Sequence, residues 1–536
     1  MVTIDPTKVT AAHSQGTATP ELAFDGSLST AWNSGGFAPQ WLQIDLGAVV
    51  PVSRIRLAVN QVPAGATTHV ISVVTDDSLP TPTLREIRVV SGETQGGQWL
   101  EVPIQLRTQI LRITTTLTPS WVSWSEIEVY QNPNVAPQHF GYFCSECEWV
   151  GDGSYASETS DHANLVWIGD DRGVEYVIAR IEEAARLKMK SIVMPRGVFF
   201  PRSAPTELDP NYQSNWDTYA HRLAPYINEI AAFYPVDEPD FRFSDETVTR
   251  VVAAIKTTFP EVPTAVIYSP RSAFTGHHPG VLVYDWVSLD CYSTGQFKCF
   301  NGPTESVAFD DAYYALRSLL DPARQRTFLI PQAGMRKGYA IGEQAEAYVE
   351  ALGAELDQVA ELARRDLMVV GLMPFIYQSF ESTSGNWTGL EAFPTLRAEF
   401  VALARALAAE SAAAVARCQQ TPDAGLAAPD ASWPADSSTP PPLDAAEALP
   451  GQDAGELPDA ATGDRDAEGP PHHDASGSSS AFDAAALGEV EVEEPGCGCS
   501  ATGPVTPLLG LWGWAAWASL RRRALPRAAE GRGRGR

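Results

Sequence analysis

Residues 1 to 131 contain short stretches in which hydrophobic and polar residues alternate, separated by turns rich in Gly, Pro, Asp and Ser. The alternation is clearest over residues 41–46, 53–58 and 126–130. A strand with one buried face and one solvated face alternates in this way. No stretch in this part has the spacing of a convincing helix. The pattern therefore predicts an all-β antiparallel sandwich over residues 1–131.

From residue 138 to residue 410 the pattern changes to continuous hydrophobic runs separated by amphipathic helices such as residues 176–186. Strands that are buried on both faces of a parallel sheet have such continuous runs. Eight runs match an α/β fold, the (β/α)8 TIM barrel, in number and spacing. An open doubly wound sheet is the alternative, but no Gly-rich phosphate loop follows the first run, so the barrel is favoured. The runs are residues 140–143, 164–169, 191–195, 230–236, 264–269, 283–289, 327–331 and 369–377.

Residues 419–495 are of low complexity, with Pro-Asp-Ala recurring among Ser, Gly and acidic residues. Such a segment buries too little apolar surface to fold, so we predict an extended, acidic, disordered linker. Residues 496–536 combine Gly-Cys-Gly-Cys, an apolar run over residues 505–520 and an arginine cluster. We expect a short apolar C-terminal helix there, of marginal length for crossing a bilayer.

The chain has a net charge of −28, much of it in the acidic linker. This charge argues against nucleic acid and anionic membranes as partners. Cys144 and Cys147 form half of a zinc pattern, but no second pair follows at suitable spacing. Local disulfides in an exported protein fit better, and Cys291 with Cys299 is a second candidate pair.

Three segments of the first domain carry a family resemblance: residues 23–32 (AFDGSLSTAW), 41–47 (WLQIDLG) and 124–130 (WSEIEVY). They resemble the discoidin domain, the coagulation-factor type C domain shared with galactose-binding carbohydrate modules. The resemblance implies a jelly-roll sandwich that holds a glycan through loops at one end, so a polysaccharide or glycoconjugate is the expected partner. We expect Trp32 and Trp41 to belong to the core, because they lie inside the strand pattern.

The same resemblance implies a structural Ca²⁺ near the Asp-Gly turn of the first domain. The implied ligands are hard oxygen donors: Asp25, the backbone at Ser27, Thr30 and Glu126. The alternative is that Asp25 and Ser29 only stabilise a tight turn with Gly26. We expect no cofactor in the second domain.

The fourth hydrophobic run ends in Asp237-Glu238-Pro239, which places two carboxylates at the C-terminal end of a predicted barrel strand. Barrel enzymes hold their active sites at this end of the strands. The segment is similar to the acid/base strand of barrel glycosidases, in which a Glu before Pro donates the proton. That similarity implies that Glu238 is the general acid, with Asp237 helping to raise its pKa. The alternative is that both carboxylates stabilise the start of the next helix.

Glycosidic bond hydrolysis needs a second carboxyl group. Similar retaining barrels place a Glu at the end of strand seven, where this sequence has Gln332. Asp290, at the end of the sixth run, is our candidate base or nucleophile, with Gln332 hydrogen-bonding the sugar; the alternative for Asp290 is a loop cap. Glu146 and Glu381 rank lower. Three aromatic residues would stack on sugar rings or else serve as ordinary packing: Tyr292, Tyr377 and Trp387.

In the tail, the order of the Gly-Cys-Gly-Cys motif, the apolar run and the arginines resembles the myxobacterial C-terminal sorting tag. The resemblance implies export, processing at Cys497 or Cys499, and attachment to the cell envelope at the cell surface. No signal peptide is visible, so we expect the true start upstream of Met1. The sequence therefore predicts an exported glycan-binding protein with a glycoside hydrolase barrel. The alternative is a non-catalytic surface adhesin with a degenerate barrel.

Overall fold

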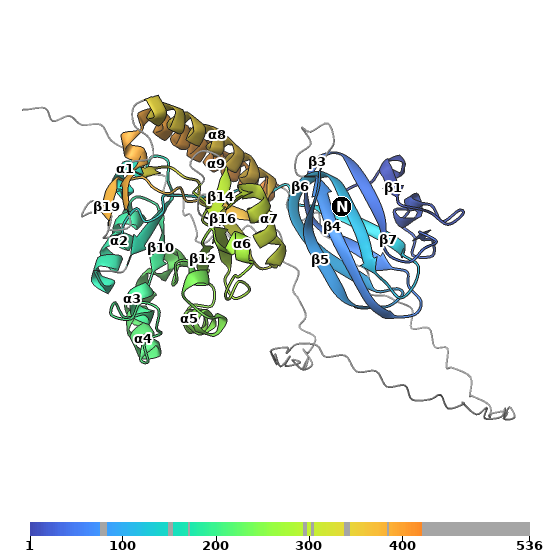
Figure 1. The fold of residues 1–536 in the computed structure, drawn as a ribbon, viewed down its shortest axis with the longest axis horizontal. Helices are drawn as coiled ribbons and strands as arrows, with labels where there is room; N and C mark the ends of the chain where they lie inside the picture. The colour runs from blue at the N-terminus through green and yellow to red at the C-terminus, as the bar shows by residue number, and fades with distance from the viewer. Residues whose placement is uncertain are drawn as a thin grey trace, which may run out of the picture. The chain divides into compact units, whose positions relative to one another are not determined.

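The computed structural model describes residues 1–74, 83–147, 154–169, 172–292, 297–301, 305–336, 343–382 and 385–420 (Figure 1). The described residues up to Ala414 belong to one compact unit. Apart from its first two residues, the predicted linker over residues 419–495 lies outside the described part of the chain, and so does the whole tail over residues 496–536.

The first domain is an antiparallel β-sandwich, as the alternating pattern predicted. Its strands run in the order β2-β7-β3-β6-β4-β5, and β1 pairs with β3. Register shifts interrupt the pairing of β3 with β6 near Asp45 and Val52, where such irregularities bend long strands. Alternate side chains of β3, including Leu42 and Ile44, are fully buried in the core. The strands are β1 (Val9–Ala11), β2 (Trp32–Asn33), β3 (Gln40–Val59), β4 (Gly65–Val74), β5 (Leu84–Thr94), β6 (Trp99–Leu117) and β7 (Ser123–Gln131).

The two tryptophans predicted in this core differ. Trp32 is fully buried, and its indole nitrogen donates a hydrogen bond to the backbone oxygen of His13 at 3.1 Å. Trp41 is only half-buried, and the Arg112 guanidinium lies 4.3 Å from the centre of its ring. The prediction was therefore correct for Trp32 and wrong for Trp41, which packs beneath a charged side chain on the strand surface.

The second domain contains eight strands that pair in parallel among the described residues. Ladders join β9-β10-β11 and β12-β13-β16-β18-β8. Single parallel bridges connect Gly141 to Leu165, beside β8 and β9, and Phe233 to Thr264, beside β11 and β12. Each of the eight predicted hydrophobic runs overlaps one strand. The strands are β8 (His139–Phe140), β9 (Leu165–Gly169), β10 (Lys190–Met194), β11 (Ile230–Phe233), β12 (Ala265–Tyr268), β13 (Trp286–Leu289), β16 (Arg326–Leu329) and β18 (Val369–Leu372).

Helices of this domain lie outside its strands (Figure 1). Helix α2 buries Val177, Ile178 and Ile181, which share one face because they recur at helical spacing. Ser244 begins α5, and its hydroxyl accepts a hydrogen bond from the Thr247 backbone nitrogen at 3.2 Å. The helices are α1 (Ala156–Thr159), α2 (Val174–Arg186), α3 (Arg196–Phe199), α4 (Tyr212–Leu223), α5 (Asp245–Thr258), α6 (Ser272–Thr275), α7 (Phe309–Leu319), α8 (Glu343–Arg365) and α9 (Pro394–Gln420).

Short 3₁₀ helices and small antiparallel strands complete the structure. The 3₁₀ helices are η1 (Pro6–Lys8), η2 (Pro20–Ala23), η4 (Ala224–Glu229), η5 (Pro239–Phe241) and η6 (Leu390–Ala392). The strands are β14 (Lys298–Asn301), β15 (Glu305–Ala308), β17 (Met335–Arg336), β19 (Phe380–Ser382) and β20 (Gly385–Thr388). Among the described residues, no helix has the length and hydrophobicity needed to cross a membrane.

A buried ion pair joins α7 to the segment between α8 and β18. The side chains of Arg317 and Asp366 are 1% and 0% exposed, and their charged groups are in direct contact. The Tyr313 hydroxyl donates to Asp366 Oδ2 at 3.0 Å, and the Met368 backbone nitrogen donates to Oδ1 at the same distance. Arg317 Nη2 also donates to the backbone oxygen of Ile104 at 2.6 Å. These partners compensate the cost of removing both charges from water.

Two disulfides confirm the predicted local pairings. Cys144 bonds to Cys147, three residues later, and Cys291 bonds to Cys299, eight residues later. Among the residues that the structure describes, no group of three or more His, Cys, Asp or Glu side chains is placed to hold a metal ion. The cysteine pattern therefore serves covalent cross-links in loops that follow β8 and β13.

Candidate functional site

Two carboxylates lie where the chain leaves β11. Asp237 forms a parallel bridge with Ile267 of β12, and the Glu238 backbone nitrogen donates to the Ile267 oxygen at 3.2 Å. Pro239 then begins η5, with Glu238 immediately before it at a φ of 44°. This left-handed conformation is uncommon for a residue with a side chain. The predicted strand end is thus held by β12 on one side and by a short helix on the other.

Glu238 is an acid with a strongly altered affinity for protons. Its side chain is 25% exposed, and Arg242 Nη2 lies 3.9 Å from its Oε2. Burial, reinforced by the charge of Asp237, raises the pKa of Glu238 to about 7 despite the opposing effect of Arg242. Glu238 therefore exchanges its proton near neutral pH, as a general acid or base requires.

Tyr234 links this turn to the interior. Its ring is fully buried, and its hydroxyl donates to Asp237 Oδ1 at 2.5 Å. The ring also meets Trp167 in an edge-to-face contact with 4.6 Å between ring centres. The Tyr234 hydrogen bond fixes Asp237, so the Asp237 charge is held beside Glu238.

Asp290 lies near the same turn, at the end of β13. It is 9% exposed, and its Oδ1 has no hydrogen-bond partner. Burial, together with the charges of Glu238 and Asp237, raises the pKa of Asp290 well above its usual range, although a hydrogen bond with Tyr292 opposes the shift. The structure therefore brings Glu238, Asp237 and Asp290 together. It also buries Asp290 in surroundings that favour the protonated form of its carboxyl group.

Three aromatic side chains form a cluster that includes Tyr292, the hydrogen-bond partner of Asp290. The half-buried ring of Tyr292 stacks on Phe375, with 4.7 Å between the ring centres. Trp387, on β20, meets Phe375 edge-to-face at 5.0 Å and Tyr292 at 5.9 Å. Two of the three predicted aromatic contacts thus gather next to Asp290, and Phe375 is a member of the group that the sequence did not single out.

Tyr377 and Gln332 have structural surroundings that differ from their predicted roles. Tyr377 is fully buried and packs against Tyr142 at 4.9 Å, so it presents no surface to a sugar in this structure. Gln332 is 2% exposed, and its amide nitrogen donates to the Gly334 oxygen at 2.9 Å and to the Tyr348 hydroxyl. The Tyr377 ring is therefore covered by neighbouring side chains, and the Gln332 amide nitrogen already donates to partners within the protein.

Glu146 caps a helix rather than joining Glu238. Its Oε1 accepts hydrogen bonds from the Tyr155 and Ala156 backbone nitrogens, both at 2.8 Å. These nitrogens lie at the start of α1, where unpaired backbone donors need an acceptor. The side chain of Glu381 lies outside the described part of the structure.

The four predicted calcium ligands of the first domain are close to one another. Thr30 Oγ1 donates to Asp25 Oδ2 at 2.7 Å and lies 3.1 Å from the backbone oxygen of Ser27. Glu126 Oε2 accepts from the Gly26 nitrogen at 2.9 Å. The alternative turn chemistry is also present, because the Ser27 nitrogen donates to Asp25 Oδ1 at 2.9 Å.

The surroundings of Glu126 disfavour the ionised form of its carboxyl group. It is 8% exposed. Burial, opposed by its hydrogen bond with Gly26 and reinforced by the charge of Asp25, raises the pKa of Glu126 from 4.5 to about 7. A buried carboxyl group close to a second carboxylate is a setting in which a cation would relieve the repulsion.

Two exposed aromatic rings lie on adjoining loops of the first domain. Phe37 is 60% exposed and Trp121 is 41% exposed. Their loops are joined by two backbone hydrogen bonds: the Ser34 nitrogen donates to the Val122 oxygen at 2.9 Å, and the Val122 nitrogen to the Gly36 oxygen at 3.0 Å. Our sequence interpretation named no ligand-contacting residue in this domain. The available signal was a large aromatic residue inside a turn, where core packing does not explain it.

Comparison with known families assigns the first domain. Residues 8–127 match the F5/8 type C domain. The first domain is an F5/8 type C domain. The match ends before the second domain begins, so it leaves residues 138–410 unassigned.

Solved structures similar to the chain include several carbohydrate-binding modules. A chitosan-binding module of a Paenibacillus sp. IK-5 chitosanase/glucanase is 29% identical, with 24% of this chain and 96% of that chain covered and a TM-score of 0.21. The family 32 module of AlyQ, in complex with 4,5-unsaturated mannuronic acid, is 26% identical, with the same coverage and TM-score. The family 32 module of Clostridium perfringens NanJ, in complex with galactose, is 20% identical, covers 24% and 97%, and has a TM-score of 0.20. The comparison with curated proteins gives no match.

Proposed function

We propose that this protein binds a glycan through its F5/8 type C domain and hydrolyses glycosidic bonds with a second domain that is a (β/α)8 barrel. The observation that carries the proposal is the partly exposed Glu238, with a pKa of about 7, beside two further carboxyl groups at strand ends. The order of the eight parallel strands supports the barrel, because the ladders and bridges lead back to the strand at which they start. Tethering a substrate through the first domain would raise its effective concentration at the second.

In the proposed reaction, Glu238 transfers its proton to the glycosidic oxygen as the bond from that oxygen to the anomeric carbon breaks. The anomeric carbon gains positive charge, and a water molecule adds its hydroxyl group to that carbon in place of the leaving sugar. The proton that this water gives up passes to solvent, from which the Glu238 carboxylate is protonated again. Burial, reinforced by the charge of Asp237 that Tyr234 holds in place, raises the pKa of Glu238 to about 7. Tyr292 and Trp387 would offer ring faces to the substrate.

The test is the release of reducing ends from a panel of polysaccharides by the full chain, run beside a binding assay on the same panel. Binding with release supports the proposal. Binding without release at any pH from 5 to 8 supports the second candidate function, a surface adhesin whose barrel is not catalytic. The raised pKa of Asp290 favours that candidate, because a base must be ionised, and Gln332 carries an amide where a second carboxylate would be needed.

The exposed rings of the first domain give the first prediction. We expect Trp121→Ala to weaken binding of the best panel glycan about tenfold, since an aromatic contact contributes roughly 0.5–1.5 kcal/mol beyond its buried area. Phe37→Ala should act in the same direction. Val89→Ala is the matched control, because Val89 is 52% exposed but lies on strand β5. Titration calorimetry measures the three affinities, and equal affinities would contradict this location of the glycan site.

We also propose that Asp25, the backbone oxygen of Ser27, Thr30 and Glu126 hold a structural Ca²⁺. The donors are all oxygens, which suits this ion, and the raised pKa of Glu126 marks a site that gains from a cation. The role of the ion would be to fix the turn at Asp25-Gly26 between η2 and β2.

Calcium should therefore stabilise the protein in a pH-dependent way. Because the folded pKa of Glu126 is raised, its ionisation costs folding stability as pH rises from about 4.5 through about 7. Ca²⁺ binds the ionised form, so we expect a larger rise in melting temperature on adding 1 mM Ca²⁺ at pH 7.5 than at pH 5.5. Glu126→Gln should remove most of this rise, whereas Glu21→Gln, an exposed change on η2, should not. A calcium effect of equal size in Glu126→Gln would rule out the site.

We further propose that the protein is exported and held at the cell envelope. The two disulfides support passage through an oxidising compartment. The sorting-tag resemblance supports attachment, and its residues lie outside the described part of the chain. Fractionation of cells that produce the full chain, followed by mass spectrometry of its C-terminus, would locate the protein and show whether the tail is removed near Cys497.

A further inference from the structure

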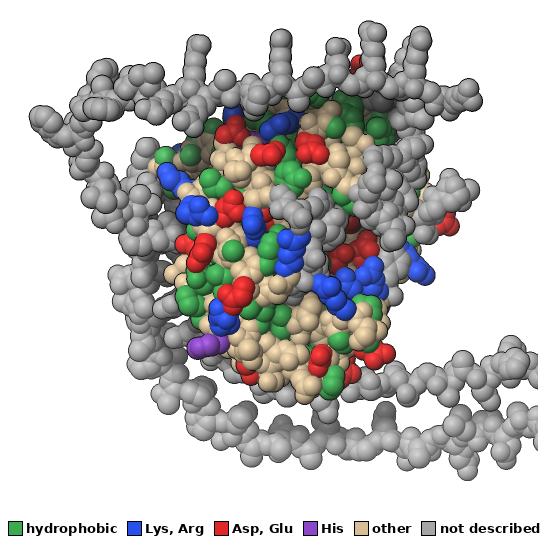
Figure 2. Space-filling view, turned by 90° about the vertical axis from the view of Figure 1, so that its left-hand side faces the viewer, with side chains coloured by type: hydrophobic (Ala, Val, Ile, Leu, Met, Phe, Trp, Pro, Cys, Tyr) green, Lys and Arg blue, Asp and Glu red, His purple; other side chains and the backbone are tan. Residues whose placement is uncertain are grey.

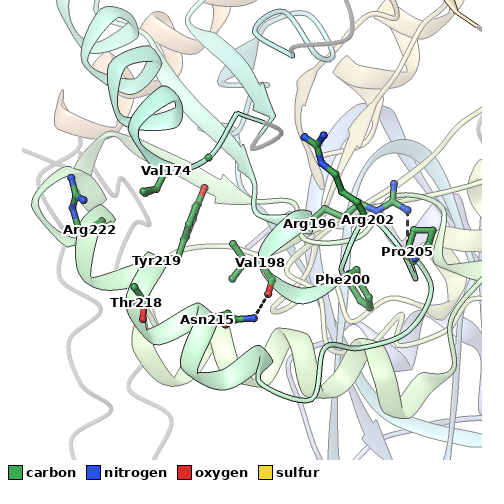
Figure 3. A pocket seen from close by; sticks show the side chains of 12 residues that line it. Val174, Arg196, Val198, Phe200, Arg202, Pro205, Asn215, Thr218, Tyr219 and Arg222 are labelled. Atoms are coloured by element: carbon green, nitrogen blue, oxygen red, sulfur yellow. Dashed lines mark hydrogen bonds between the residues drawn. The ribbon is translucent and has the colours of Figure 1, made fainter.

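A cavity of about 840 Å³ opens in the second domain (Figure 3). Its walls come from the start of α2, from α3 with the loop that follows it, and from one face of α4. Ligand-binding pockets in proteins usually have volumes of about 300–1,000 Å³, so this cavity has the size of a ligand site.

The cavity lining is positively charged, although the chain as a whole is negatively charged. The protein has 66 acidic and 38 basic residues. The twelve described residues that line the cavity include Arg196, Arg202 and Arg222 and no Asp or Glu. In the close-up, Arg196 and Arg202 stand together on one side and Arg222 stands on the other (Figure 3). The face of the molecule shown in Figure 2 likewise carries several Lys and Arg side chains among acidic ones.

The contacts of Arg196 and Arg222 leave them able to accept a ligand. Arg222 pairs with Glu175 at 2.5 Å, but these side chains are 49% and 69% exposed, and such exposed pairs contribute little energy. Arg196 Nη2 donates to the Pro205 oxygen over a long 3.5 Å. A ligand oxyanion could displace either contact, because a guanidinium binds carboxylate or sulfate oxygens with two parallel hydrogen bonds.

Between the arginines the walls are mainly apolar and aromatic. Val198 and Tyr219 lie in the middle of the close-up, and Phe200 lies below Arg196 and Arg202 (Figure 3). Phe200 packs against Phe243 with 4.7 Å between ring centres. Phe243 follows Arg242 directly, so one wall residue of the cavity contacts the segment that carries the proposed proton donor.

We infer that this cavity binds an acidic oligosaccharide, with sugar carboxylates or sulfate esters on the arginines and sugar faces along the aromatic walls. The inference rests on the proposed function for its assignment of the ligand as a segment of the substrate. It makes the substrate class of the second domain an acidic polysaccharide. Binding at the cavity itself does not depend on hydrolysis.

The experiment compares binding of polygalacturonate oligosaccharides, sulfated dextran oligosaccharides and neutral dextran oligosaccharides of similar length. All measurements use the full chain with Trp121→Ala, which reduces the contribution of the F5/8 type C domain. We expect binding of at least one acidic probe and at least tenfold weaker binding of the neutral one. Arg196→Gln with Arg222→Gln should weaken acidic binding at least tenfold. Arg196→Lys with Arg222→Lys should restore part of it, because charge returns without the two-pronged hydrogen bonding.

Arg250→Gln is the matched control, since Arg250 is also a helical, partly exposed arginine but does not line the cavity. Thermal melting of each variant verifies that it is folded. Binding of only the carboxylated probe or only the sulfated probe identifies the oxyanion, and either result supports the inference. Equal binding of the neutral probe, or acidic binding that persists in the double Gln variant, overturns it. Arginine-dependent binding without cleavage would support the cavity as a binding site and contradict the proposed hydrolase activity. Cleavage of neutral glycans alone would support the hydrolase activity and contradict the cavity as a site for acidic sugars.

Discussion

Glu238→Gln should reduce glycan hydrolysis by about 10²–10⁴-fold, which is the usual contribution of a positioned general acid or base. The amide cannot give up a proton, but it keeps the size of the side chain and the Glu238 backbone contact with Ile267. Glycan binding should therefore persist within about twofold. The loss would appear in kcat, measured by reducing-end release on the best substrate of the panel, because the proton moves only as the bond breaks.

The pH dependence of the wild-type protein provides a second measurement on the same residue. The raised pKa of about 7 means that Glu238 is protonated below neutral pH and ionised above it. If it acts as the acid, kcat/KM should fall as pH rises through about 7. Glu229→Gln is the control, because Glu229 is 39% exposed and pairs with Lys190 away from the strand end. Undiminished hydrolysis by Glu238→Gln, or a rate that rises through pH 7, would contradict the assignment of Glu238 as proton donor.

Asp366→Ala should lower the free energy of unfolding by about 3–5 kcal/mol, because it leaves the Arg317 charge buried without its partner. The Tyr313 hydroxyl and the Met368 nitrogen lose an acceptor at the same time. Urea denaturation followed by tryptophan fluorescence measures the loss. Most of it should be recovered in Asp366→Leu with Arg317→Met, where both charges are absent, though not all, since Arg317 also donates to Ile104.

Asp311→Ala is the matched control for this ion pair. Asp311 also lies at 2.6 Å from an arginine, Arg85, but its side chain is 55% exposed. Exposed pairs of this kind contribute about 0–1 kcal/mol. Equal losses in Asp311→Ala and Asp366→Ala would show that burial does not determine the strength of these pairs.

The strands of this protein could be predicted because the hydrophobic pattern indicates how many faces of a strand are buried. Alternating hydrophobic residues indicate one buried face, and a continuous hydrophobic run indicates two. That rule located β3 and β7 in the sandwich and one strand in each of the eight runs of the second domain. It also explains why Glu238 and Asp290 meet, since parallel strands end at the same edge. The covalent pairings of Cys144 and Cys291 were predictable because their partners are close in sequence.

Side-chain surroundings were much harder to predict, because they depend on segments that are distant in sequence. Tyr377 follows a strand just as Tyr292 does, yet it turns toward Tyr142 and is fully buried. Gln332 was expected at a sugar, but Tyr348 of α8 reaches its amide. Nothing in the linear pattern brings Arg196 and Arg222 to the walls of one cavity, because the loop after α3 and the helix α4 create that space together.

The Cys291–Cys299 disulfide makes the local structure at Asp290 depend on the redox environment of the polypeptide. Cys291 stands between Asp290 and Tyr292, so the cross-link anchors the backbone of both. A bridge between cysteines only eight residues apart removes little freedom from the unfolded chain, so its main consequence is local. In a thiol-rich cytosol this anchor would stay open, and oxidation would close it. The redox state of this one cysteine pair therefore determines whether the backbone at Asp290 and Tyr292 is anchored.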